Sequence, residues 1–462
     1  MPPMLTLILH MFIIDLLPGR NKLQFGLKNR VFHWINKPPA ETDFPWMYNK
    51  HMSILSGKRI ILGVTGSIAA YKAADLASKL TQAGAQVDVI FTNAAEKFVT
   101  PLTFQSVTGR RAYTDADLWG NEAHVLHVGL GHKTDLLVIA PCTANTIAKL
   151  AHGQADNLLT VTALASQAPL VIAPAMDGGM FDHPATQENL DTLSKRGAYV
   201  IEPAEGHLAS GLTGVGRLPE THELIGHIRL VLGRRGLLAG KRVLVTAGGT
   251  QEPLDPVRVL TNRSSGRQGY ALVQAALDAG AQVTLVTTPV ALTPPVGAEV
   301  IHVETAGQML DAVMKEFPES DALIMAAAVA DFRPKNVAED KIKKEGGIPQ
   351  IELEATEDIL KAVAGIRLVL SKGEGSSKKR KQVVVGFAAE SQNLLQNAVN
   401  KLQSKKLDLI AANDISAEDA GFSVETNRIT LLFADGRRES LSLMSKTEAA
   451  GIIVERVAAL LE

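Results

Sequence analysis

Residues 246–269 have the sequence TAGGTQEPLDPVRVLTNRSSGRQG. It follows the apolar run KRVLV (241–245) and precedes YALVQAALDAGAQVTLVT, a pattern that predicts a helix and then a strand. A glycine-rich turn between a strand and a helix places backbone N–H groups where anions bind. A long polar insert delays this helix, and Arg258, Asn262 and Arg267 lie on it. The pattern therefore predicts a loop that binds a large anionic ligand.

Apolar runs of strand length recur on both sides of this stretch. They are separated by segments of helical spacing, such as residues 66–84 and 143–153. Continuous apolar strands that alternate with helices predict a parallel sheet covered on both faces. The runs are 59–64, 85–92, 135–141 and 169–176, and then 241–245, 281–288, 321–330, 382–390 and 407–414.

A break rich in glycine and arginine, VLGRRGLLAG, separates the two series. We therefore predict an α/β fold of two Rossmann-like three-layer units. The expected boundaries are an extension at 1–51, a first domain at 52–232, a linker at 233–240 and a second domain at 241–462. The charged segment 371–382 is expected to be a solvated loop.

Composition limits the possible partners. The chain has 462 residues, 46% of them hydrophobic and 21% charged, with a formal net charge of -1. The absence of a basic excess argues against nucleic acid or a membrane surface as the main partner. The single cysteine, Cys142, excludes a disulfide framework within the chain and favours the cytoplasm. Residues 1–17 are apolar but short for a membrane span, so we expect an extension outside the fold, with a membrane anchor as the alternative.

Four motifs mark the first half. Gly63, Gly66 and Ser67 lie between a strand and a helix, where a phosphate or an ordinary tight turn would fit equally well. PCTANT (141–146) and PAMDGGMFDHPATQENL (174–190) each follow a predicted strand. EGHLASGLTGVGRLPE (205–220) is glycine-rich, as expected of a mobile flap. His127 lies in a polar segment with His124 and His132, which we expect to be a loop.

Together these motifs resemble the flavin-dependent cysteine decarboxylases. From about residue 58 onward, the chain resembles the bifunctional decarboxylase–ligases of bacterial coenzyme A biosynthesis. The resemblance implies a flavodoxin-like first domain that binds FMN and decarboxylates a cysteine conjugate, with His127 as the catalytic histidine. It also implies a set of flavin-binding residues, namely Gly66, Ser67, Thr92, Thr143, Asn145 and Met176.

Two positions depart from this family. Asp177 replaces the asparagine of P-A-M-N, which binds the substrate carboxylate, and Ser210 replaces the cysteine of A-C-G, which acts as the acid. A serine hydroxyl is a far weaker acid than a thiol, and an ionised Asp177 would repel a carboxylate. We expect the decarboxylase to be active with these two residues. The alternative is that its half-reaction is slow or lost. Cys142 is expected to be a buried apolar thiol rather than a replacement.

The second half resembles the CTP-dependent ligase of the same family. The resemblance implies that Asn262 holds an acyl-cytidylate, that Lys341 is catalytic and that Asp331 contacts the nucleotide or Mg²⁺. Arg258 and Arg267 have side chains suited to phosphate. We expect both the GGT and the SSG turn to offer N–H donors. Glu357 stands where proline is usual. The remaining residues expected to bind substrate or CTP are Ala327, Asp358, Ile359, Leu360, Phe387, Lys401 and Lys405.

The resemblance implies one enzyme with two activities, a carbon–nitrogen ligase and a carboxy-lyase. It would join 4'-phosphopantothenate to cysteine and decarboxylate the product to 4'-phosphopantetheine, as a homo-oligomer that uses FMN and Mg²⁺. Three alternatives stay open: a ligase with a weak flavin half, a non-catalytic flavoprotein regulator, and an NAD reductase. The sequence does not contain the G-x-G-x-x-G fingerprint of dinucleotide-binding folds, which argues against the NAD reductase.

Overall fold

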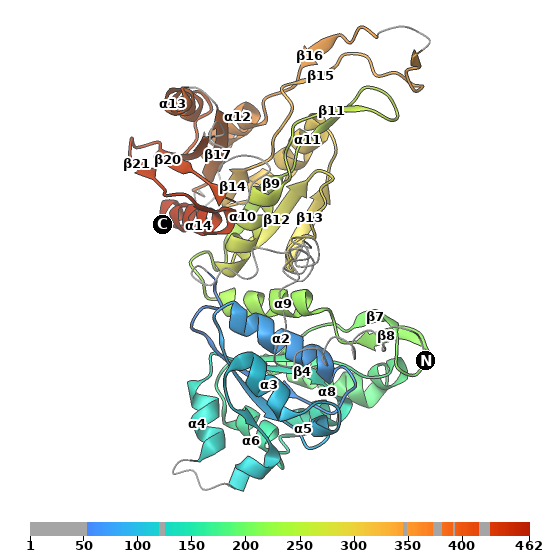
Figure 1. The fold of residues 1–462 in the computed structure, drawn as a ribbon. Coiled ribbons are helices and arrows are strands. Elements are labelled where there is room, and N and C mark those ends of the chain that lie inside the picture. Colours follow the sequence, from blue (N-terminus) through green and yellow to red (C-terminus); the bar gives the residue numbers. More distant parts are fainter. Residues whose placement is uncertain (1–52, 120–124, 345–348, 373–380, 391–392, 415–425) are drawn as a thin grey trace, which may run out of the picture. The chain divides into compact units, whose positions relative to one another are not determined.

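Two predominantly parallel sheets, each flanked by helices, organise the chain (Figure 1). The structure is a computed structural model that describes residues 53–119, 125–344, 349–372, 381–390, 393–414 and 426–462. The expected extension at 1–51 lies outside the described residues, as does most of the charged segment 371–382. No described helix combines the length and the apolarity needed to cross a bilayer.

The first sheet has six parallel strands in the order β3-β2-β1-β4-β5-β6. Helix α2 contacts both α3 and α9, whereas α5, α6 and α8 share a second apolar cluster with the sheet. The strands are β1 Arg59–Val64, β2 Gln86–Phe91, β3 Ala112–Tyr113, β4 Leu136–Cys142, β5 Leu170–Pro174 and β6 Tyr199–Val200. The helices are α2 Ala70–Gln82, α3 Pro101–Thr108, α4 Leu126–Lys133, α5 Ala144–His152, α6 Leu158–Ala165, α8 Pro184–Lys195 and α9 Thr221–Gly233.

Two helices that flank this sheet end next to glycines with positive φ angles. Gly153 has φ 67° directly after α5, and Gly84 has φ 94° two residues after α2. These are conformations that glycine adopts without a Cβ clash. Inside β1, a Cβ on Gly63 would lie 2.6 Å from the Leu159 side chain, so helix α6 can pack closely on the strand.

The second sheet has eight strands in the order β13-β12-β9-β14-β17-β18-β20-β21. The first six are parallel, as predicted, but β20 and β21 pair antiparallel at one edge. This antiparallel edge departs from the predicted parallel sheet. The strands are β9 Arg242–Ala247, β12 Gln282–Thr287, β13 Ala298–His302, β14 Ala322–Met325, β17 Val383–Glu390, β18 Leu409–Asp414, β20 Ile429–Phe433 and β21 Arg438–Ser440.

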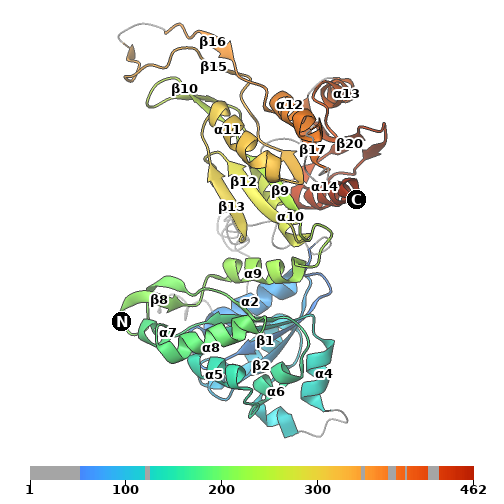
Figure 2. The same ribbon diagram turned by 180° about the vertical axis from the view of Figure 1, so that it is seen from behind.

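Helices cover both faces of this sheet (Figure 2). On one face α10 (Arg267–Asp278) and α14 (Lys446–Leu461) pack against each other and the strands. On the other face lie α11 (Ala306–Glu316), α12 (Ile359–Lys372) and α13 (Leu394–Ser404). The predicted α/β class of two wound units is confirmed.

The insert at 246–269 is a hairpin rather than the predicted open loop. Strands β10 (Gln251–Pro253) and β11 (Val259–Thr261) pair antiparallel, and the SSG turn then leads directly into α10. A second hairpin, β15 (Phe332–Pro334) with β16 (Leu353–Ala355), contacts the first. Both hairpins extend from the same end of the second sheet (Figures 1 and 2). We call them the two arms.

Helices α9 and α10 are joined by a buried ion pair. Arg229 of α9 is 2% exposed, and its Nε donates to Asp278 Oδ1 of α10 at 3.0 Å. Its Nη2 donates to Oδ2 of the same carboxylate at 2.5 Å. This bidentate geometry fixes the two helices together at one point.

Two candidate active sites

The first candidate site is a cavity of about 440 Å³ above the carboxyl ends of the first parallel strands. In open α/β sheets ligands bind at this edge. Its walls are the start of α2, the turn before α5, the segment after β5 and a hairpin flap. The flap consists of β7 (Ala204–His207) and β8 (Thr213–Arg217). Six predicted site residues line the cavity, namely Gly66, Ser67, Thr143, Met176, Asp177 and Ser210.

The two departures from the family pattern are in direct contact. Ser210 Oγ donates a hydrogen bond to Asp177 Oδ2 at 2.6 Å, although the two residues are far apart in sequence. Asp177 also caps α7 (Gly178–Phe181), because its Oδ1 accepts from Gly179 N at 3.0 Å. The bond from Ser210 and then that from Gly179 lower the pKa of the Asp177 carboxyl. Asp177 is therefore ionised at neutral pH in the ligand-free protein.

Close backbone contacts hold the flap against this loop. Met176 N donates to Gly216 O at 3.0 Å. Gly216 has φ 149°, and a Cβ there would lie 2.2 Å from Met176 O. On the other side, Lys72 Nζ donates to Glu220 Oε1 at 2.7 Å and to Leu218 O at 3.2 Å. The flap can approach the cavity this closely because Gly216 has no side chain.

Three predicted residues of the first half lie outside the cavity. Thr92 follows β2 and is buried, and Asn145 is exposed on α5. His127 lies on α4, so the loop expected around His127 and His132 is wrong, and His124 lies outside the described residues. The Thr92 Oγ1 and His127 Nδ1 atoms are buried and have no hydrogen-bond partner among the described residues. Buried polar atoms of this kind call for a ligand, a water or a further chain.

Cys142 is fully buried at the end of β4, and burial raises the pKa of its thiol. The expectation of a buried apolar thiol is confirmed.

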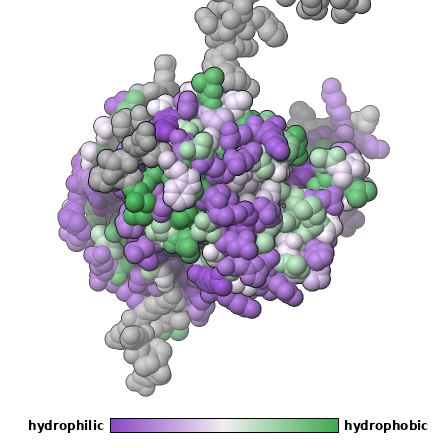
Figure 3. All heavy atoms as spheres, turned by 90° about the horizontal axis from the view of Figure 1, so that it is seen from below, coloured by the Kyte–Doolittle hydropathy of each residue, from purple (hydrophilic) through white to green (hydrophobic). Residues whose placement is uncertain are grey.

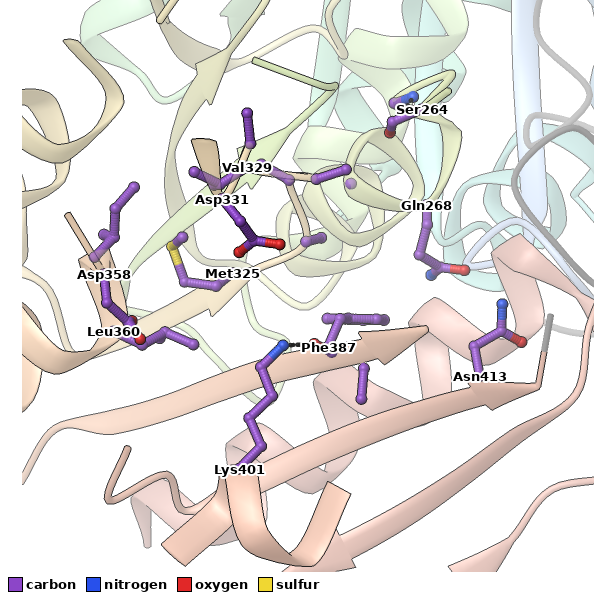
Figure 4. A pocket seen from close by; sticks show the side chains of 18 of the residues that line it. Ser264, Gln268, Met325, Val329, Asp331, Asp358, Leu360, Phe387, Lys401 and Asn413 are labelled. Atoms are coloured by element: carbon purple, nitrogen blue, oxygen red, sulfur yellow. Dashed lines mark hydrogen bonds between the residues drawn. The ribbon is translucent and has the colours of Figure 1, made fainter. Parts of the chain in front are cut away.

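The second candidate site is a cavity of about 540 Å³ in the other unit. It lies beyond the ends of β14, β17 and β18, which are neighbours in the sheet. Figure 4 shows Asp331 and Lys401 reaching toward the same space from opposite walls. The Lys401 ammonium donates to Phe387 O at 2.8 Å. Nine predicted residues line this cavity, namely Ala327, Asp331, Glu357, Asp358, Ile359, Leu360, Phe387, Lys401 and Lys405.

An ion pair closes one wall of this cavity. Lys405 Nζ lies 3.0 Å from Asp358 Oδ2. Burial raises the pKa of the Asp358 carboxyl, but hydrogen bonds from Lys405 and from Lys361 N outweigh that effect, so its pKa lies below the usual value. The neighbouring Thr356 ties this wall to Asp331, because Thr356 N donates to Asp331 O at 3.0 Å.

The two glycine turns of the opening stretch have different roles. The SSG turn lines the cavity, together with Arg267 at the start of α10. The GGT turn does not line it, and Thr250 N donates to Ala328 O at 3.3 Å instead. Gly248 has φ 88°, and a Cβ there would lie 2.0 Å from Thr288 Oγ1. The expected N–H donors of GGT are therefore not at the cavity.

Arg258, Asn262 and Lys341 do not line the second cavity. Asn262 lies close to its wall, since its Nδ2 donates to the carbonyls of Ala328 and Val329 at 3.2 Å each. Arg258 and Lys341 lie on the two arms, which meet around the buried Asp255.

The Asp255 carboxylate connects the arms. It accepts from Val257 N and Arg258 N at 2.8 Å each and from Ile342 N at 3.1 Å. Arg258 Nη2 in turn donates to Ile342 O at 3.1 Å. Burial raises the pKa of Asp255, but these backbone donors and the Arg258 guanidinium outweigh it, so the pKa is lowered. The arm that carries Arg258 is thus joined to the arm that carries Lys341 through the backbone of Ile342.

Sequence reasoning missed several cavity residues, among them Gln268, Asn413, Asn427 and Lys446. The S-x-x-E pattern of Ser445 and Glu448 forms a capping box, which marks the helix that begins at Lys446. That signal predicts a helix start but not a cavity wall. No group of three or more potential metal-ligating side chains occurs among the described residues.

Comparison with known proteins covers nearly all of the described chain. A family model called Flavoprotein matches residues 49–233, and one described as "DNA/pantothenate metabolism flavoprotein C-terminal domain" matches residues 238–461. "Coenzyme A biosynthesis bifunctional protein CoaBC" of Bacillus subtilis is 45% identical over 88% of this chain and 98% of its own length. The chain belongs to this family. The protein of the same name from Vibrio cholerae is 44% identical over 88% of this chain and 99% of its own.

The chain is therefore a bifunctional enzyme of coenzyme A biosynthesis, with a decarboxylase and a ligase activity. Solved structures match each half of this CoaBC family member. The C-terminal domain of a CoaBC protein is 39% identical, covers 49% of this chain and 98% of its own, and has a TM-score of 0.40. The FMN-dependent cysteine decarboxylase SpaF is 36% identical, covers 35% and 91%, and has a TM-score of 0.32.

Proposed function

We propose that this enzyme joins 4'-phosphopantothenate to cysteine with CTP and then decarboxylates 4'-phosphopantothenoylcysteine to 4'-phosphopantetheine. The observation that carries the proposal is the second cavity, where the predicted Asp331, Lys401 and Lys405 meet at the carboxyl ends of parallel strands. It combines cationic side chains with the N-terminus of α10. Such a site suits a nucleotide that carries phosphates.

The ligation requires activation of a carboxylate. A carboxylate oxygen of 4'-phosphopantothenate attacks the α-phosphorus of CTP, which forms an acyl-cytidylate and releases pyrophosphate. The cysteine amine then displaces CMP and forms the amide. We assign stabilisation of the acyl-cytidylate to Asn262, which lies against the cavity wall, and electrostatic stabilisation of phosphate charge to Lys341.

The second cavity suits an Mg²⁺ ion that binds together with the nucleotide. It binds through one or two carboxylates and the substrate phosphates, so a protein cluster is not required. Asp331 points into the cavity (Figure 4) and is the carboxylate that we assign to the ion.

The residues in and around the first cavity suit FMN. The start of α2 faces the cavity, and Thr92 Oγ1, which is buried outside its lining, has no partner among the described residues. We assign the cofactor to Gly66, Ser67, Thr92, Thr143, Asn145 and Met176. When bound, FMN supplies reversible two-electron oxidation of the carbon that bears the thiol, which gives the departing carboxylate an electron sink. The residues around it orient the substrate and exclude water.

We assign Asp177 and Ser210 to the substrate end of that cavity as one functional unit. Because Ser210 donates its proton to an ionised carboxylate, it is a poor proton source on its own. A substrate carboxylate beside Asp177 would share a proton with it, as paired carboxylates do. The pair therefore works as a coupled variant of the asparagine and cysteine of the family.

A variant series tests this coupling. Asp177→Asn and Ser210→Cys each replace one partner of the 2.6 Å bond with a weaker one, whereas the double variant restores the family pair. We expect each single variant to decarboxylate more slowly than the wild-type enzyme and the double variant to match or exceed it. If the effects of the two single substitutions on the decarboxylation rate simply add in the double variant, Asp177 and Ser210 are not coupled.

We also propose that the enzyme is a homo-oligomer in which the arms and α4 contact other copies. Arg258 and Lys341 lie on the arms and not at the cavity of their own chain, and His127 Nδ1 is buried without a described partner. Large apolar side chains near α4 are exposed, with Trp119 at 88% and Leu164 at 67%. Hydrophobic residues also lie among hydrophilic ones on the face shown in Figure 3.

Two measurements test the overall proposal. Purified enzyme is incubated with FMN, CTP, Mg²⁺, 4'-phosphopantothenate and cysteine, and the products are followed by mass spectrometry. We expect 4'-phosphopantetheine; accumulation of 4'-phosphopantothenoylcysteine would leave a ligase with a disabled flavin half.

The second measurement mixes inactive Lys341→Ala and Asp331→Asn subunits after reversible dissociation. We expect the mixture to recover ligase activity. In some of the mixed oligomers, an unsubstituted Lys341 from one subunit would meet an unsubstituted Asp331 from another. No recovery in mixed oligomers would place Lys341 in the pocket of its own chain.

A further inference from the structure

Two long helices begin at the same wall of the second cavity, and each begins with a cation. Helix α10 starts at Arg267 after Gly266, whose φ is 75°, and α14 starts at Lys446 after Ser445. The two helices pack against each other, and both Arg267 and Lys446 line the cavity. Asp331, Lys401 and Lys405 line the other walls.

The charges gathered at this wall are of the same sign. Each helix N-terminus carries roughly half a positive charge, so cations are usually found at the opposite end. Lys446 is only 6% exposed. Burial, and then the charge of Arg267, lowers the pKa of the Lys446 ammonium from its usual value to about 8. The protein thus keeps two cations and two helix N-termini together at one wall of a cavity.

Polar contacts fix this wall in place. Asn427 Nδ2 donates to Gln268 Oε1 at 2.7 Å, and Gln268 Nε2 donates to the Lys446 carbonyl at 3.4 Å. Figure 4 shows Gln268 and Asn413 on one side of the cavity. The Asn413 Oδ1 atom is buried and has no hydrogen-bond partner among the described residues, so one polar atom at this wall awaits a ligand or a water.

Two carboxylates of the described residues near this wall take part in other contacts. Glu448 of α14 accepts from Ser445 N and Ser445 Oγ at 2.8 Å each, which completes the helix cap. Asp358 is paired with Lys405 at 3.0 Å. Asp331 and Glu357 also line the cavity, and the first of them is the residue that we assign to Mg²⁺. A bound anion would complement Arg267 and Lys446 directly.

We propose that Arg267 and Lys446, together with the N-termini of α10 and α14, form a phosphate-binding site, and that Lys446 takes up a proton when the phosphate binds. The proposal deepens the proposed function, on which it rests for the ligands that carry phosphate. A phosphate dianion at this wall favours the charged form of Lys446, so binding and proton uptake are linked. No bond to phosphorus is made or broken in this step.

Two ligands of the enzyme carry such a group, and the experiment separates them. The phosphate belongs either to the polyphosphate of the nucleotide or to 4'-phosphopantothenate. Calorimetric titrations use CTP with Mg²⁺, pyrophosphate and 4'-phosphopantothenate, with pantothenate as the phosphate-free control. Loss of affinity for CTP and pyrophosphate assigns the site to the nucleotide, and loss for 4'-phosphopantothenate assigns it to the other substrate.

The decisive variants are Lys446→Met and Lys446→Arg. We expect Lys446→Met to weaken binding of the phosphate ligand by about tenfold or more, the size of a charge-assisted hydrogen bond. Lys446→Arg keeps the charge, so its affinity should stay within about threefold of the wild-type value. Lys315→Met is the control, because Lys315 is an exposed cation of α11 outside the cavity. It should bind all ligands as the wild-type protein does.

Measurement of proton uptake distinguishes phosphate binding by Lys446 from a purely structural role of this residue. Titrations at pH 8 in buffers of different ionisation enthalpy should show uptake of up to about half a proton by the wild-type protein, relative to Lys446→Arg. Thermal melting without ligand should show that Lys446→Met is folded and at least as stable as the wild-type protein, because a buried cation has been removed.

Two outcomes would overturn the proposal. One is unchanged affinity of Lys446→Met for every phosphate ligand, and the other is equal proton uptake by the wild-type protein and Lys446→Arg. Binding of pyrophosphate needs no turnover, so it can be measured even in an enzyme preparation without ligase activity. Pyrophosphate binding that depends on Lys446, in a protein that makes no 4'-phosphopantothenoylcysteine, would refute the proposed function and leave this site standing.

Discussion

At least one side chain in each cavity has a shifted pKa. In the first, Ser210 and Gly179 N together keep the Asp177 carboxyl ionised. In the second, Lys446 is held at a pKa of about 8 by burial and by Arg267. One cavity thus presents a stabilised anion, and the other presents a cation whose charge depends on pH near neutrality.

Removing the Ser210 hydroxyl should raise the pKa of Asp177. The lowered pKa depends first on the bond from Ser210, and the bond from Gly179 N remains in Ser210→Ala. We expect an upward shift toward the ordinary aspartate value of about 3.9. A titration of side-chain carboxyl carbons by NMR measures it. An unchanged Asp177 titration would mean that the Ser210 bond does not form in solution.

Lys446 should make the stability of the ligand-free protein depend on pH. Its folded pKa of about 8 lies below the unfolded value, so the unfolded chain binds more protons between the two. The stability contributed by this group is therefore lowest below about pH 8 and rises toward pH 10. The midpoint of urea unfolding should rise across this window more steeply in the wild-type protein than in Lys446→Met. Parallel pH profiles for the two proteins would contradict a depressed pKa.

At the scale of elements, the flap is the part of the first cavity most sensitive to a small change. A Cβ at Gly216 would lie 2.2 Å from Met176 O, so Gly216→Ala must push β8 away from the loop that carries Asp177. We expect decarboxylation to slow by about tenfold to a hundredfold, because displacements near 1 Å have such effects. Ligation should be unchanged. Both rates can be measured on the same preparation by product mass spectrometry.

The matched control for this prediction is Gly214→Ala in the same strand. There a Cβ would meet only the Leu208 side chain, at 3.9 Å. It should decarboxylate at nearly the wild-type rate. If both alanine variants are equally slow, the strand tolerates no side chains at all, and the close approach to Met176 is not the cause.

Elements with a clear apolar pattern were predicted well, and those without one were not. The runs at 59–64 and 135–141 became β1 and β4 because burial on both faces leaves little choice of residue. Strand β11 is three exposed residues with no alternation, so its hairpin was read as a loop. The segment around His127 is glycine-rich, which concealed helix α4.

The site was predictable where a motif is local and not where contacts cross the chain. PAMD and the flap could be recognised in sequence, but the Asp177–Ser210 bond depends on how the flap folds back. No local motif marks Asp255, which joins segments that are far apart in sequence. Lys446 matched an ordinary helix start, and only the packing of α14 on α10 brings it to the cavity.

At the scale of the whole molecule, the Arg229–Asp278 pair is the buried ionic contact between α9 and α10. Removing one partner leaves a charge in a buried position, which costs about 3 kcal/mol or more. We therefore expect Asp278→Asn to lower the free energy of unfolding by roughly that amount. Chemical denaturation followed by circular dichroism measures it. The exposed Asp311 of α11 provides the control, and an equal loss in Asp311→Asn would refute the special role of the buried pair.

The two cavities can be completed at different times during synthesis, because their residues leave the ribosome in sequence order. The walls of the first cavity come from residues 66 to 218, and those of the second from residues 264 to 446. Domains generally fold as units during synthesis, beginning with the N-terminal one. A nascent chain thus has every residue of its first cavity while the second cavity still lacks walls. The first cavity can form during translation, whereas the second is complete only when the start of α14 has emerged.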